Sequence, residues 1–312
     1  MALQAVILAG GKGSRLLSRS NNLPKPMVPV LGKPLLQYQI ELCAKQGITD
    51  IQILVEYRSE AIQEYFGDGS SFGVAIEYHK ESDPRGTAGA LLDIVDSLND
   101  QFLVLYGDTF LDVDFNKMWS FHIDRKADAT LFLHPNDHPK DSDLVEVNSQ
   151  SLITNIYTYP HDSTMWYRNL VNAALYILNK SALIEIDIPM QNPDIAKHLF
   201  PRLLKSNKSL YGYISTEYIK DMGTPDRLDC VEQDVISGKV NSLSRGSKKQ
   251  AFFIDRDGVI NQEVNHLSSA DQLELIPGVG RAISKINKAG ILVVVITNQP
   301  VVARGELTEA GL

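Results

Sequence analysis

Cysteine is nearly absent from this chain: Cys43 and Cys230 are its two thiols, and they stand far apart in the sequence. The amino terminus has no basic stretch, no long apolar run and no small-residue cleavage site, so it does not match a secretory signal. No window approaches the roughly 18 consecutive apolar residues that a membrane span needs. These absences predict a cytoplasmic protein with reduced thiols and no membrane partner.

Positive charge is also scarce, with 30 Lys and Arg against 38 Asp and Glu, a net charge of −8 and a pI near 5.4. A nucleic-acid binder needs a basic surface, so this balance argues against that class. The fractions of hydrophobic residues (44%) and charged residues (22%) indicate an ordinary globular protein. At 312 residues the chain exceeds one average domain, and it contains no internal repeat.

The first 140 residues alternate short β-rich apolar runs with amphipathic stretches. The expected strands are 5–9, 51–55, 74–78, 102–106 and 129–133, and the expected helices are 35–43, 61–66 and 88–98. This alternation predicts an α/β fold with a Rossmann-like mixed, mostly parallel sheet and helices on both faces. Strands at 144–147, 152–156 and 171–178 then predict a mixed-sheet region that holds a second substrate. Helices are expected again at 193–205 and 225–237.

A polar stretch rich in Gly, Ser and Lys, residues 238–249, separates two strongly patterned regions. We therefore expect a first domain at 1–238, a linker at 239–249 and a second domain at 250–312. The second has the pattern of one βαβ unit, with strands at 251–254 and 291–297 and a helix at 278–289. About 60 residues hold a marginal core and an incomplete sheet leaves an open edge. We expect either the front part of a longer protein or a degenerate second domain.

The segment LAGGKGSRL, residues 8–16, leaves the first expected strand and leads towards a helix. Its glycines let backbone N–H groups approach phosphates, although a tight strand-to-helix turn would use the same residues. Gly13 stands where a Walker A motif needs Ser or Thr, and Leu16 stands where GxGxxG needs glycine. Ten residues after Arg15, Lys25 lies between two prolines that restrict the backbone. Two cations beside a glycine loop suit a triphosphate.

Together with five further motifs, this loop makes the region of about residues 1–238 resemble the sugar-1-phosphate nucleotidyltransferases. In order, the motifs are LAGGKGSRL, PKPM at 24–27, GTAGAL at 86–91, GDTF at 107–110, VNAALYIL at 171–178 and DMGTP at 221–225. The resemblance implies an enzyme of nucleotide-sugar biosynthesis that joins a nucleoside triphosphate to a sugar 1-phosphate and releases pyrophosphate. It is strongest to guanylyltransferases that act on D-glycero-D-manno-heptose 1-phosphate, which serve lipopolysaccharide, capsule or S-layer glycans. Mannose-1-phosphate guanylyltransferases and glucose-1-phosphate thymidylyl- or uridylyltransferases are the alternatives.

The resemblance also assigns a catalytic centre. Arg15 and Lys25 would hold the triphosphate and stabilise charge on the phosphoryl oxygens. Asp108 follows an expected strand at the carboxyl edge, where open α/β sheets bind ligands. Together with Asp221 it would coordinate Mg²⁺, the expected cofactor. The alternatives are an Asx turn for Asp108 and a turn aspartate before Gly223 for Asp221.

The nucleotide is expected to contact the glycine loop and the GTAGAL motif. The nucleotide-binding residues that the resemblance implies are Leu8, Ala9, Gly10, Gly11, Gly13, Ser14, Glu81, Gly86, Thr87 and Gly89. A carboxylate at Glu81 only accepts hydrogen bonds, and guanine offers adjacent donors at N1 and the exocyclic amine. Glu81 therefore favours GTP over dTTP and UTP. A solvated surface glutamate is the alternative.

The sugar side of the site departs from the family's pattern. The sugar-phosphate residues that the resemblance implies are Asn172, Ala173 and Thr224. Many members carry a Glu-Lys pair before a proline, with the lysine on the sugar phosphate, whereas this chain has Tyr157-Thr158-Tyr159-Pro160. Either Arg168 or Lys220 supplies the missing cation, or the sugar phosphate binds weakly.

Beyond the linker, FIDRDGVI at 253–260 and a later Thr-Asn-Gln resemble the haloacid dehalogenase phosphatases, especially those acting on a heptose bisphosphate or histidinol phosphate. By that resemblance Asp255 would be the nucleophile and Asp257 the acid and base, while Thr297 and Asn298 would bind phosphate. That family's later lysine and acidic metal ligands have no place before Leu312. We expect an inactive fragment.

Three classes of function remain: the transferase, a heptose bisphosphate phosphatase if the second domain is complete in a longer protein, and an inactive sugar-nucleotide sensor. The four residues of the expected catalytic centre favour the transferase, and a homo-oligomer stays open. His134 and His138 have zinc-site spacing, but the proline after each disfavours a helix, so a surface loop is expected. Cys43 is expected to pack on an apolar helix face.

Overall fold

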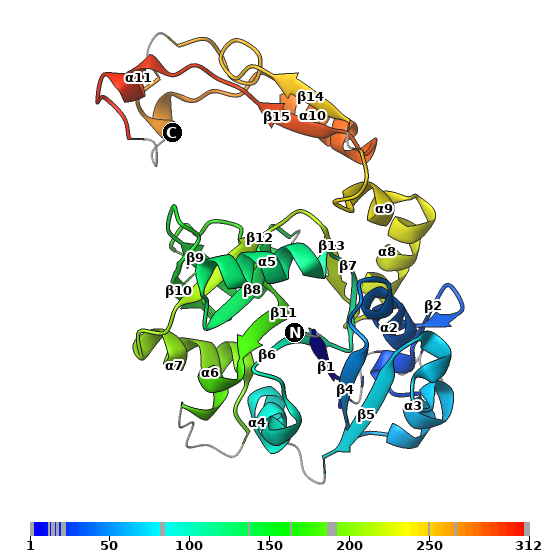
Figure 1. Cartoon of the computed structure of the whole chain (residues 1–312). Coiled ribbons are helices and arrows are strands. Elements are labelled where there is room, and N and C mark those ends of the chain that lie inside the picture. Colours follow the sequence, from blue (N-terminus) through cyan, green and yellow to red (C-terminus); the bar gives the residue numbers. More distant parts are fainter. Residues whose placement is uncertain are drawn as a thin grey trace. The chain divides into compact units, whose positions relative to one another are not determined.

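The computed structural model describes residues 3–11, 13, 16, 19, 23–81, 85–136, 138–162, 164–185, 192–248, 250–264 and 267–308. The chain divides into two compact units, Met1–Arg245 and Gly246–Leu312 (Figure 1). Both units combine helices with parallel strands. The division falls at residue 245, inside the stretch that was expected to be a linker.

One sheet is the frame of the first unit. Within the described residues it has nine strands in the order β10-β9-β11-β6-β1-β4-β5, with β8 beside β11 and β12 beside β8. Its parallel centre consists of β1 (Gln4–Leu8), β4 (Asp50–Val55), β5 (Ala75–Lys80) and β6 (Gln101–Tyr106). The antiparallel β11 (Val171–Asn179) joins this centre to β8 (Ala129–His134), β9 (Leu144–Val147), β10 (Ile153–Tyr157) and β12 (Leu210–Ile214). The predicted mixed, mostly parallel sheet is confirmed.

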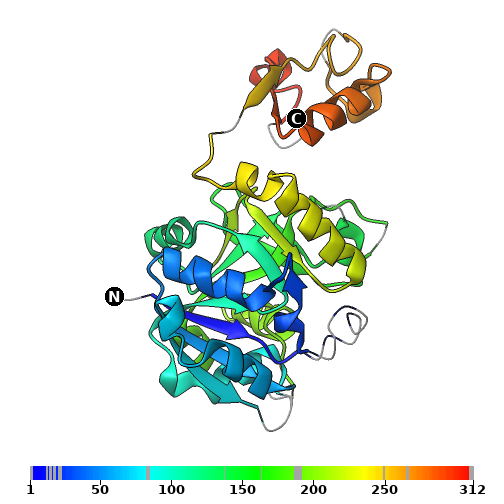
Figure 2. The ribbon, with the colours of Figure 1, turned by 90° about the vertical axis from the view of Figure 1, so that its right-hand side faces the viewer.

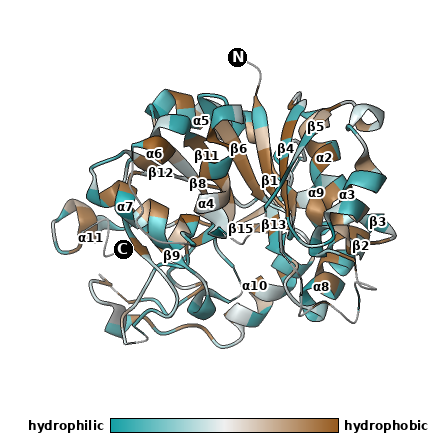
Figure 3. Ribbon diagram, turned by 90° about the horizontal axis from the view of Figure 1, so that it is seen from below, coloured by the Kyte–Doolittle hydropathy of each residue, from teal (hydrophilic) through white to brown (hydrophobic). Residues whose placement is uncertain are grey.

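Helices cover both faces of this sheet (Figure 2). Successive side chains of a strand point to opposite faces, so Ala5 and Ile7 pack in one core layer and Val6 in the other. The first layer holds α2 (Leu35–Lys45), α3 (Ser59–Phe66) and α5 (Phe115–Arg125), and the second holds α4 (Gly86–Asp93), α6 (Lys180–Ile184) and α7 (Phe200–Lys205). Figure 3 shows hydrophobic residues along the central strands between these layers. Cys43 of α2 is fully buried, as expected, and burial raises the pKa of its thiol to about 12.

A third packed layer lies beside the carboxyl end of β6. It contains the antiparallel pair β7 (Thr109–Asp112) and β13 (Tyr218–Asp221), the hairpin of β2 (Pro29–Val30) and β3 (Lys33–Pro34), the turn η2 (Lys25–Met27) and helix α8 (Pro225–Ile236). Helix α9 (Lys239–Leu243) adds Val240 and Leu243 to this layer. Residues 239–243 of the expected linker thus form a short helix whose two partly buried apolar side chains pack against the core of the first unit.

Two expected helices have a different form. The helix expected at 88–98 ends at Asp93, and the 3₁₀ turn η4 (Val95–Ser97) follows it. The helix expected at 193–205 begins as the π-helix η6 (Ile195–Leu199) before α7. Two further 3₁₀ turns are η3 (Ser70–Phe72) and η5 (Pro139–Asp141).

The second unit contains the expected βαβ pattern. Strands β14 (Ala251–Ile254) and β15 (Leu292–Val295) pair in parallel, and α10 (Val279–Lys288) lies between them in the chain. The turn η7 (Ala270–Gln272) and the short helix α11 (Pro300–Ala303) complete the unit. Its core is thin: Phe253 of β14 is 64% exposed, and no side chain of α10 is buried among the described residues.

Candidate active site

The site of the first unit lies where the order of the parallel strands reverses. Strand β1 pairs with β4 on one side and with β6 on the other. Ligands of open α/β sheets bind at such a switch point, beyond the carboxyl ends of the strands. The glycine loop follows β1 and Asp108 follows β6, and the N–H of Gly107 donates to the carbonyl of Leu8 at 2.9 Å. Both motifs therefore meet at one edge of the sheet.

A cavity of 460 Å³ opens at this edge. Its lining includes most of the predicted nucleotide-binding positions, namely Leu8, Gly10, Gly11, Gly13, Glu81, Gly86 and Thr87, together with Lys25, Pro26, Glu56, Ala90, Tyr106, Asp108 and Gly223. Two predicted positions do not line it: Ala9 is buried with its N–H donating to Leu54, and Gly89 packs inside α4. Ser14 and Arg15 lie outside the described residues.

Lys25 is held in place by the prolines on either side. It begins the η2 turn, in which Pro26 and Met27 are buried and the N–H of Met27 donates to the carbonyl of Pro24 at 2.8 Å. A Cβ added to Gly13, whose φ is +63°, would lie 2.9 Å from the Cβ of Lys25, so this close approach requires glycine. The Lys25 side chain is 12% exposed, and its ammonium pairs with the Asp108 carboxylate.

The GTAGAL motif forms the opposite wall of this cavity. Gly86 has a φ of +67°, and a Cβ there would lie 2.6 Å from the carbonyl oxygen of Pro193, so no other residue fits. The Thr87 hydroxyl donates to Asp194 at 3.0 Å and accepts from the N–H of Ile195 at 2.8 Å. These contacts anchor the start of α4 to the segment before η6, so the wall is fixed before any ligand arrives.

Two carboxylates, those of Glu56 and Glu81, also line this cavity. Glu81 follows β5 and Glu56 follows β4, and a Cβ added to Gly10 would lie 3.6 Å from Glu81 Oε1 and 3.4 Å from the Cβ of Glu56. Burial raises the pKa of the Glu81 carboxyl; the N–H of Arg85, which donates to it at 3.3 Å, opposes this effect, and the negative charge of Glu56 adds to it. Glu81 is thus half-buried in the cavity wall.

A larger cavity of 620 Å³ adjoins the first, and Tyr106 and Asp108 line both. Asp221 lines the larger one. It is the neighbour of Thr109 in the β7–β13 pair, and the N–H of Met222 donates to the carbonyl of Asp108 at 2.8 Å. The structure therefore brings Asp108 and Asp221 together from positions 113 residues apart, by the difference 221 − 108.

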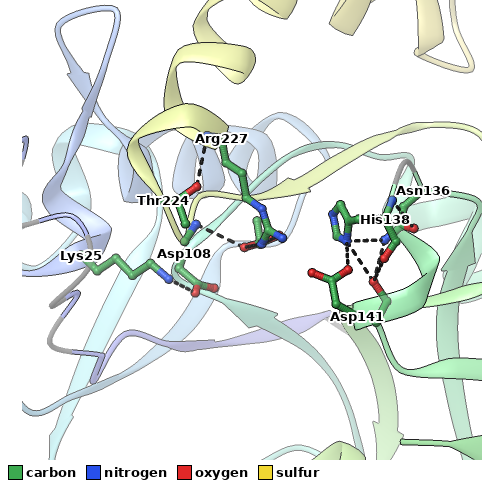
Figure 4. Close-up of polar contacts among 10 residues, drawn as sticks. Lys25, Asp108, Asn136, His138, Asp141, Thr224 and Arg227 are labelled. Carbon is green, nitrogen blue, oxygen red and sulfur yellow. Dashed lines mark hydrogen bonds and ion pairs between the residues drawn. The ribbon is translucent and has the colours of Figure 1, made fainter. Parts of the chain in front are cut away.

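Buried Gln39 on α2 fixes the turn that carries Asp108. Its Nε2 donates to the carbonyls of Tyr106 at 2.8 Å and of Thr109 at 2.7 Å, on either side of the aspartate. Arg227 lies next to the second aspartate: its Nη1 donates to Asp221 at 2.7 and 2.5 Å (Figure 4). Each of the two carboxylates thus has a cation beside it, Lys25 for Asp108 and Arg227 for Asp221.

The predicted sugar-side residues fall in two places. Asn172 and Ala173 line the larger cavity at an irregularity in β11, where Ala174 has a φ of +56° and its N–H donates to Asn172 Oδ1 at 3.2 Å. Thr224 caps α8 instead, since its hydroxyl accepts from the N–H of Arg227 at 3.4 Å. The Thr224 side chain therefore positions the helix that carries Arg227.

A polar wall of the larger cavity lies opposite the two aspartates and consists of Asn136, His138, Asp141 and Ser142 (Figure 4). His138 Nδ1 lies 3.1 Å from Asp141 Oδ1 and 3.1 Å from Ser142 Oγ, and Asn136 Nδ2 donates to Ser142 Oγ at 2.9 Å. His134 is in β8 rather than in the expected loop. Among the described residues, no cluster of three or more His, Cys, Asp or Glu side chains is arranged to hold a metal.

Several residues of the site were not predicted from the sequence. Tyr106 directly precedes the GDTF motif, Glu56 follows a strand as Glu81 does, and Arg227 is three residues beyond Thr224 in the first turn of a helix. Position next to a recognised motif was the available signal for Tyr106 and Arg227, and position at the end of an expected strand was the signal for Glu56. Of the two expected substitute cations, Lys220 lines the larger cavity, whereas Arg168 is exposed and is not part of either lining.

The second unit also places its aspartates after a parallel strand. Asp257 accepts hydrogen bonds from Asn261 at 3.0 Å, from Arg256 at 3.2 Å, from Thr297 at 3.4 Å and from Gln299. Burial acts to raise the pKa of Asp257, but the hydrogen bonds from Asn261, Arg256 and Gln299 outweigh it and hold that pKa below its ordinary value. Asp255 accepts from the N–H of Arg256 at 2.7 Å. Asn298 follows Thr297 directly, beyond the end of β15.

A glycine loop and an aspartate at the switch point of a mostly parallel sheet, with two adjoining cavities, define a phosphate-handling α/β protein. Residues 4–237 match the model of the nucleotidyl transferase family, and the chain belongs to this family. No helix in the described ranges has the length and apolar character that a membrane crossing demands.

Relatives of stated function are about a third identical to this chain over the aligned residues. Mannose-1-phosphate guanylyltransferase of Mycobacterium tuberculosis is 30% identical over 238 residues, which are 76% of this chain and 65% of that protein. D-glycero-alpha-D-manno-heptose 1-phosphate guanylyltransferase of Campylobacter jejuni is 33% identical over 227 residues, which are 72% of this chain and 96% of that protein. The chain thus spans about two thirds of the first relative and nearly all of the second.

The fold has a solved counterpart. The crystal structure of HddC from Yersinia pseudotuberculosis matches with a TM-score of 0.64 and 23% identity, over 75% of this chain and 99% of that chain. A second structure of HddC, complexed with GMP-PN, matches with a TM-score of 0.62. At 23% identity the match supports the fold of the first unit.

Proposed function

We propose that the chain is a guanylyltransferase that joins GTP and a sugar 1-phosphate into a GDP-sugar and releases pyrophosphate. The observation that carries this proposal is the pair of cavities that adjoin at Tyr106 and Asp108. A reaction between two phosphate-bearing substrates needs one cavity for each and a shared point where the reacting groups meet. The relatives named above, which are guanylyltransferases, support the same reaction class.

In this reaction an oxygen of the sugar phosphate attacks the α-phosphorus of GTP. The new bond joins the two phosphates, the bond from the α-phosphorus to the β-phosphate oxygen breaks, and pyrophosphate leaves with its electrons. Lys25 would hold the triphosphate beside the glycine loop, with Arg15 from the same motif. Because charge on the phosphoryl oxygens dominates the barrier, these cations would contribute most of the catalysis.

Asp108 and Asp221 would hold Mg²⁺. This hard cation binds one or two carboxylates and completes its coordination with water and phosphate oxygens. Two aspartates that line one cavity, one in β13 and the other directly before β7, the strand paired with it, fit that demand. When bound, the metal would neutralise charge on the phosphates.

Glu81 supports guanine as the base. It is half-buried in the wall of the smaller cavity, and Glu56 lines the same cavity, so two carboxylates offer acceptors beside Gly10. The N1 and amino donors of guanine can pair with a carboxylate, whereas thymine and uracil offer one donor between two carbonyls. A base with two donors is therefore the better match.

For the sugar we propose D-glycero-D-manno-heptose 1-phosphate. The heptose-specific relative is aligned over 96% of its own length. The second unit resembles heptose bisphosphate phosphatases, and such a fusion would join consecutive steps, since a bisphosphate must lose one phosphate before its anomeric phosphate is activated. Asn136, His138 and Asp141 would offer both donors and acceptors to the extra hydroxyl of a heptose.

A matrix of substrates with pyrophosphate release as the readout tests these assignments. GTP, dTTP and UTP are each paired with heptose 1-phosphate, mannose 1-phosphate and glucose 1-phosphate. We expect the highest kcat/KM for GTP with heptose 1-phosphate. Its advantage over mannose 1-phosphate should be about 10²-fold if the polar groups that bind the extra hydroxyl have no partner when mannose 1-phosphate is bound. A preference for glucose 1-phosphate would overturn the sugar assignment, and pyrophosphate release from no pair would overturn the reaction.

Mannose 1-phosphate is the second candidate, because the Mycobacterium tuberculosis relative is a mannose-1-phosphate guanylyltransferase. The same matrix separates the two sugars. Equal kcat/KM for both would indicate a cavity that leaves room for the extra hydroxymethylene group without binding it.

A further inference from the structure

Three basic side chains from Lys and Arg line the larger cavity within the described residues: Lys220, Arg227 and Lys239. If this cavity takes the sugar 1-phosphate, as the proposed function requires, these three side chains are the candidates for a cation that binds its phosphate from within the cavity. Lys239 is engaged by Asp234, with Nζ at 3.0 and 3.1 Å from the two carboxylate oxygens. This ion pair joins Lys239 of α9 to Asp234 of α8, so the Lys239 ammonium already has a counter-ion.

Of the three basic side chains that line the larger cavity, Arg227 is the one that contacts Asp221. Its guanidinium contacts Asp221, which is the strand neighbour of Thr109, the residue directly after Asp108. Lys220 precedes Asp221 in β13, and successive side chains of a strand leave on opposite faces. Arg227 and Lys220 therefore approach the cavity from different directions, and it is Arg227 that shares the Asp221 side.

The local structure holds the Arg227 guanidinium ready for an anion. Its side chain is 27% exposed and lines the larger cavity, and both contacts to Asp221 are made by Nη1, so among the described residues Nε and Nη2 have no side-chain partner. The planar guanidinium binds two phosphate oxygens at once. Arg227 also lies in the first turn of the twelve-residue helix α8, whose dipole favours an anion at that end.

We propose that Arg227 binds the phosphate of the sugar 1-phosphate, with Asp221 orienting its guanidinium. The proposal rests on the proposed function, because it needs a sugar phosphate in the larger cavity. It assigns the sugar-phosphate cation to neither Arg168 nor Lys220. It also gives Thr224 a positioning role, since the Thr224 hydroxyl caps the turn that carries Arg227.

The test compares Arg227→Gln and Arg227→Lys with Lys220→Gln in the whole chain, and with Arg281→Gln as a matched control that removes an exposed arginine of α10. Steady-state kinetics give KM for the sugar phosphate and for GTP separately. Calorimetry measures binding of mannose 1-phosphate, with mannose as the probe that lacks the phosphate, to the chain without nucleotide. Thermal unfolding checks that each variant is folded.

We expect Arg227→Gln to raise the KM for the sugar phosphate and the Kd for mannose 1-phosphate by about 10- to 100-fold, as for loss of one charged hydrogen-bonding partner. KM for GTP should stay within about twofold, Arg227→Lys should recover part of the loss, and Arg281→Gln should match the parent. A larger loss in Lys220→Gln than in Arg227→Gln, or an equal rise of both KM values in Arg227→Gln, would overturn the proposal. If the parent binds mannose 1-phosphate but shows no turnover with any sugar phosphate, the proposed function fails and the binding comparison still decides the role of Arg227.

Discussion

Two aspartates follow parallel strands in this chain, and their surroundings differ. Asp108 follows β6, whose inner residues Phe102 to Leu105 are fully buried, while Asp257 comes soon after β14, whose side chains are largely exposed. Around Asp108, Gln39 fixes the backbone and Lys25 provides a counter-charge, and two cavities open onto its carboxylate.

The carboxylate of Asp257 instead accepts hydrogen bonds from its own loop and from the segment that follows β15. Side chains of Arg256, Asn261, Thr297 and Gln299 all donate to it. The comparison teaches that a strand followed by an aspartate is a similar pattern in both units, whereas the packing behind the strand and the partners of the carboxylate differ. The predictions below test this difference, starting with the largest effect.

Asp108→Asn should lower the rate of pyrophosphate release by at least about 10²-fold, because it removes a negative charge at the point where the cavities adjoin without changing the volume of the side chain. It also leaves Lys25 without its partner carboxylate. The measurement is pyrophosphate release with saturating substrates, and the far-UV circular dichroism spectrum should match the parent. A folded variant with near-parental turnover would remove Asp108 from the catalytic centre.

Glu81→Gln should narrow the preference for GTP over dTTP and UTP, because the amide can pair with an imide and no longer presents acceptors alone. The change is expected in kcat/KM for the nucleotide, by about tenfold, with KM for the sugar phosphate unchanged. Burial raises the pKa of Glu81, so its acceptor form is lost at a higher pH than for an exposed glutamate. The preference for GTP should therefore weaken as the pH falls. Equal rates with all nucleotides in the parent would contradict this role of Glu81.

The core of the first unit should have a pH-dependent stability that involves His122. This fully buried residue of α5 has Nδ1 2.8 Å from Thr130 Oγ1 and Nε2 3.1 Å from Asn179 Oδ1. Burial lowers its pKa below the ordinary 6.5, although Asn179 and Asp128 oppose the effect. Below pH 6.5 the unfolded chain binds a proton that the folded chain does not, so stability is complete above that pH and is lost as the pH falls towards the folded pKa.

Thermal unfolding between pH 8 and pH 5 checks this prediction, since each kcal/mol lost lowers Tm by about 2–4 °C in a domain of this size. His122→Gln should flatten the dependence of Tm on pH in this range, and His79→Gln, a partly exposed histidine beside Gln52, should retain it. An identical pH profile for His122→Gln and the parent would show that other groups cause the dependence.

The sequence was sufficient for the parallel centre of the sheet because those strands are short, continuous and apolar. It did not predict β7 and β13, since these four-residue strands are short, overlap the edges of the GDTF and DMGTP motifs and have little periodicity of their own. Helix α5 was also missed, although Asp114 caps it and Phe115, Met118 and His122 share its buried side. Attention to the cap would have found it.

For the site, motifs predicted which residues line the smaller cavity but not how their charges pair. The proximity of Asp108 and Asp221 depends on the β7–β13 pairing, and the contact of Arg227 with Asp221 depends on where α8 begins. Both are tertiary features that have no signature in local sequence. The polar wall of Asn136, His138 and Asp141 likewise requires knowing that the loop after β8 faces the larger cavity.

The smallest expected effect concerns the second unit: the whole chain should release no phosphate from a heptose bisphosphate, and Asp255→Asn should change nothing. A phosphate-accepting aspartate needs a cation that neutralises the phosphoryl oxygens. Arg256 is the cation next to Asp255, and it donates to Asp257 through Nε and Nη2, each at 3.2 Å. The strand that carries these residues is exposed, so it lacks the packed support that fixes Asp108.

Phosphate is assayed separately from pyrophosphate, in the parent, in Asp255→Asn and in Asp108→Asn. Phosphate release that persists in Asp108→Asn and disappears in Asp255→Asn would show that the second unit is a working phosphatase. It would also show that the exposed strand β14 positions Asp255 well enough for catalysis.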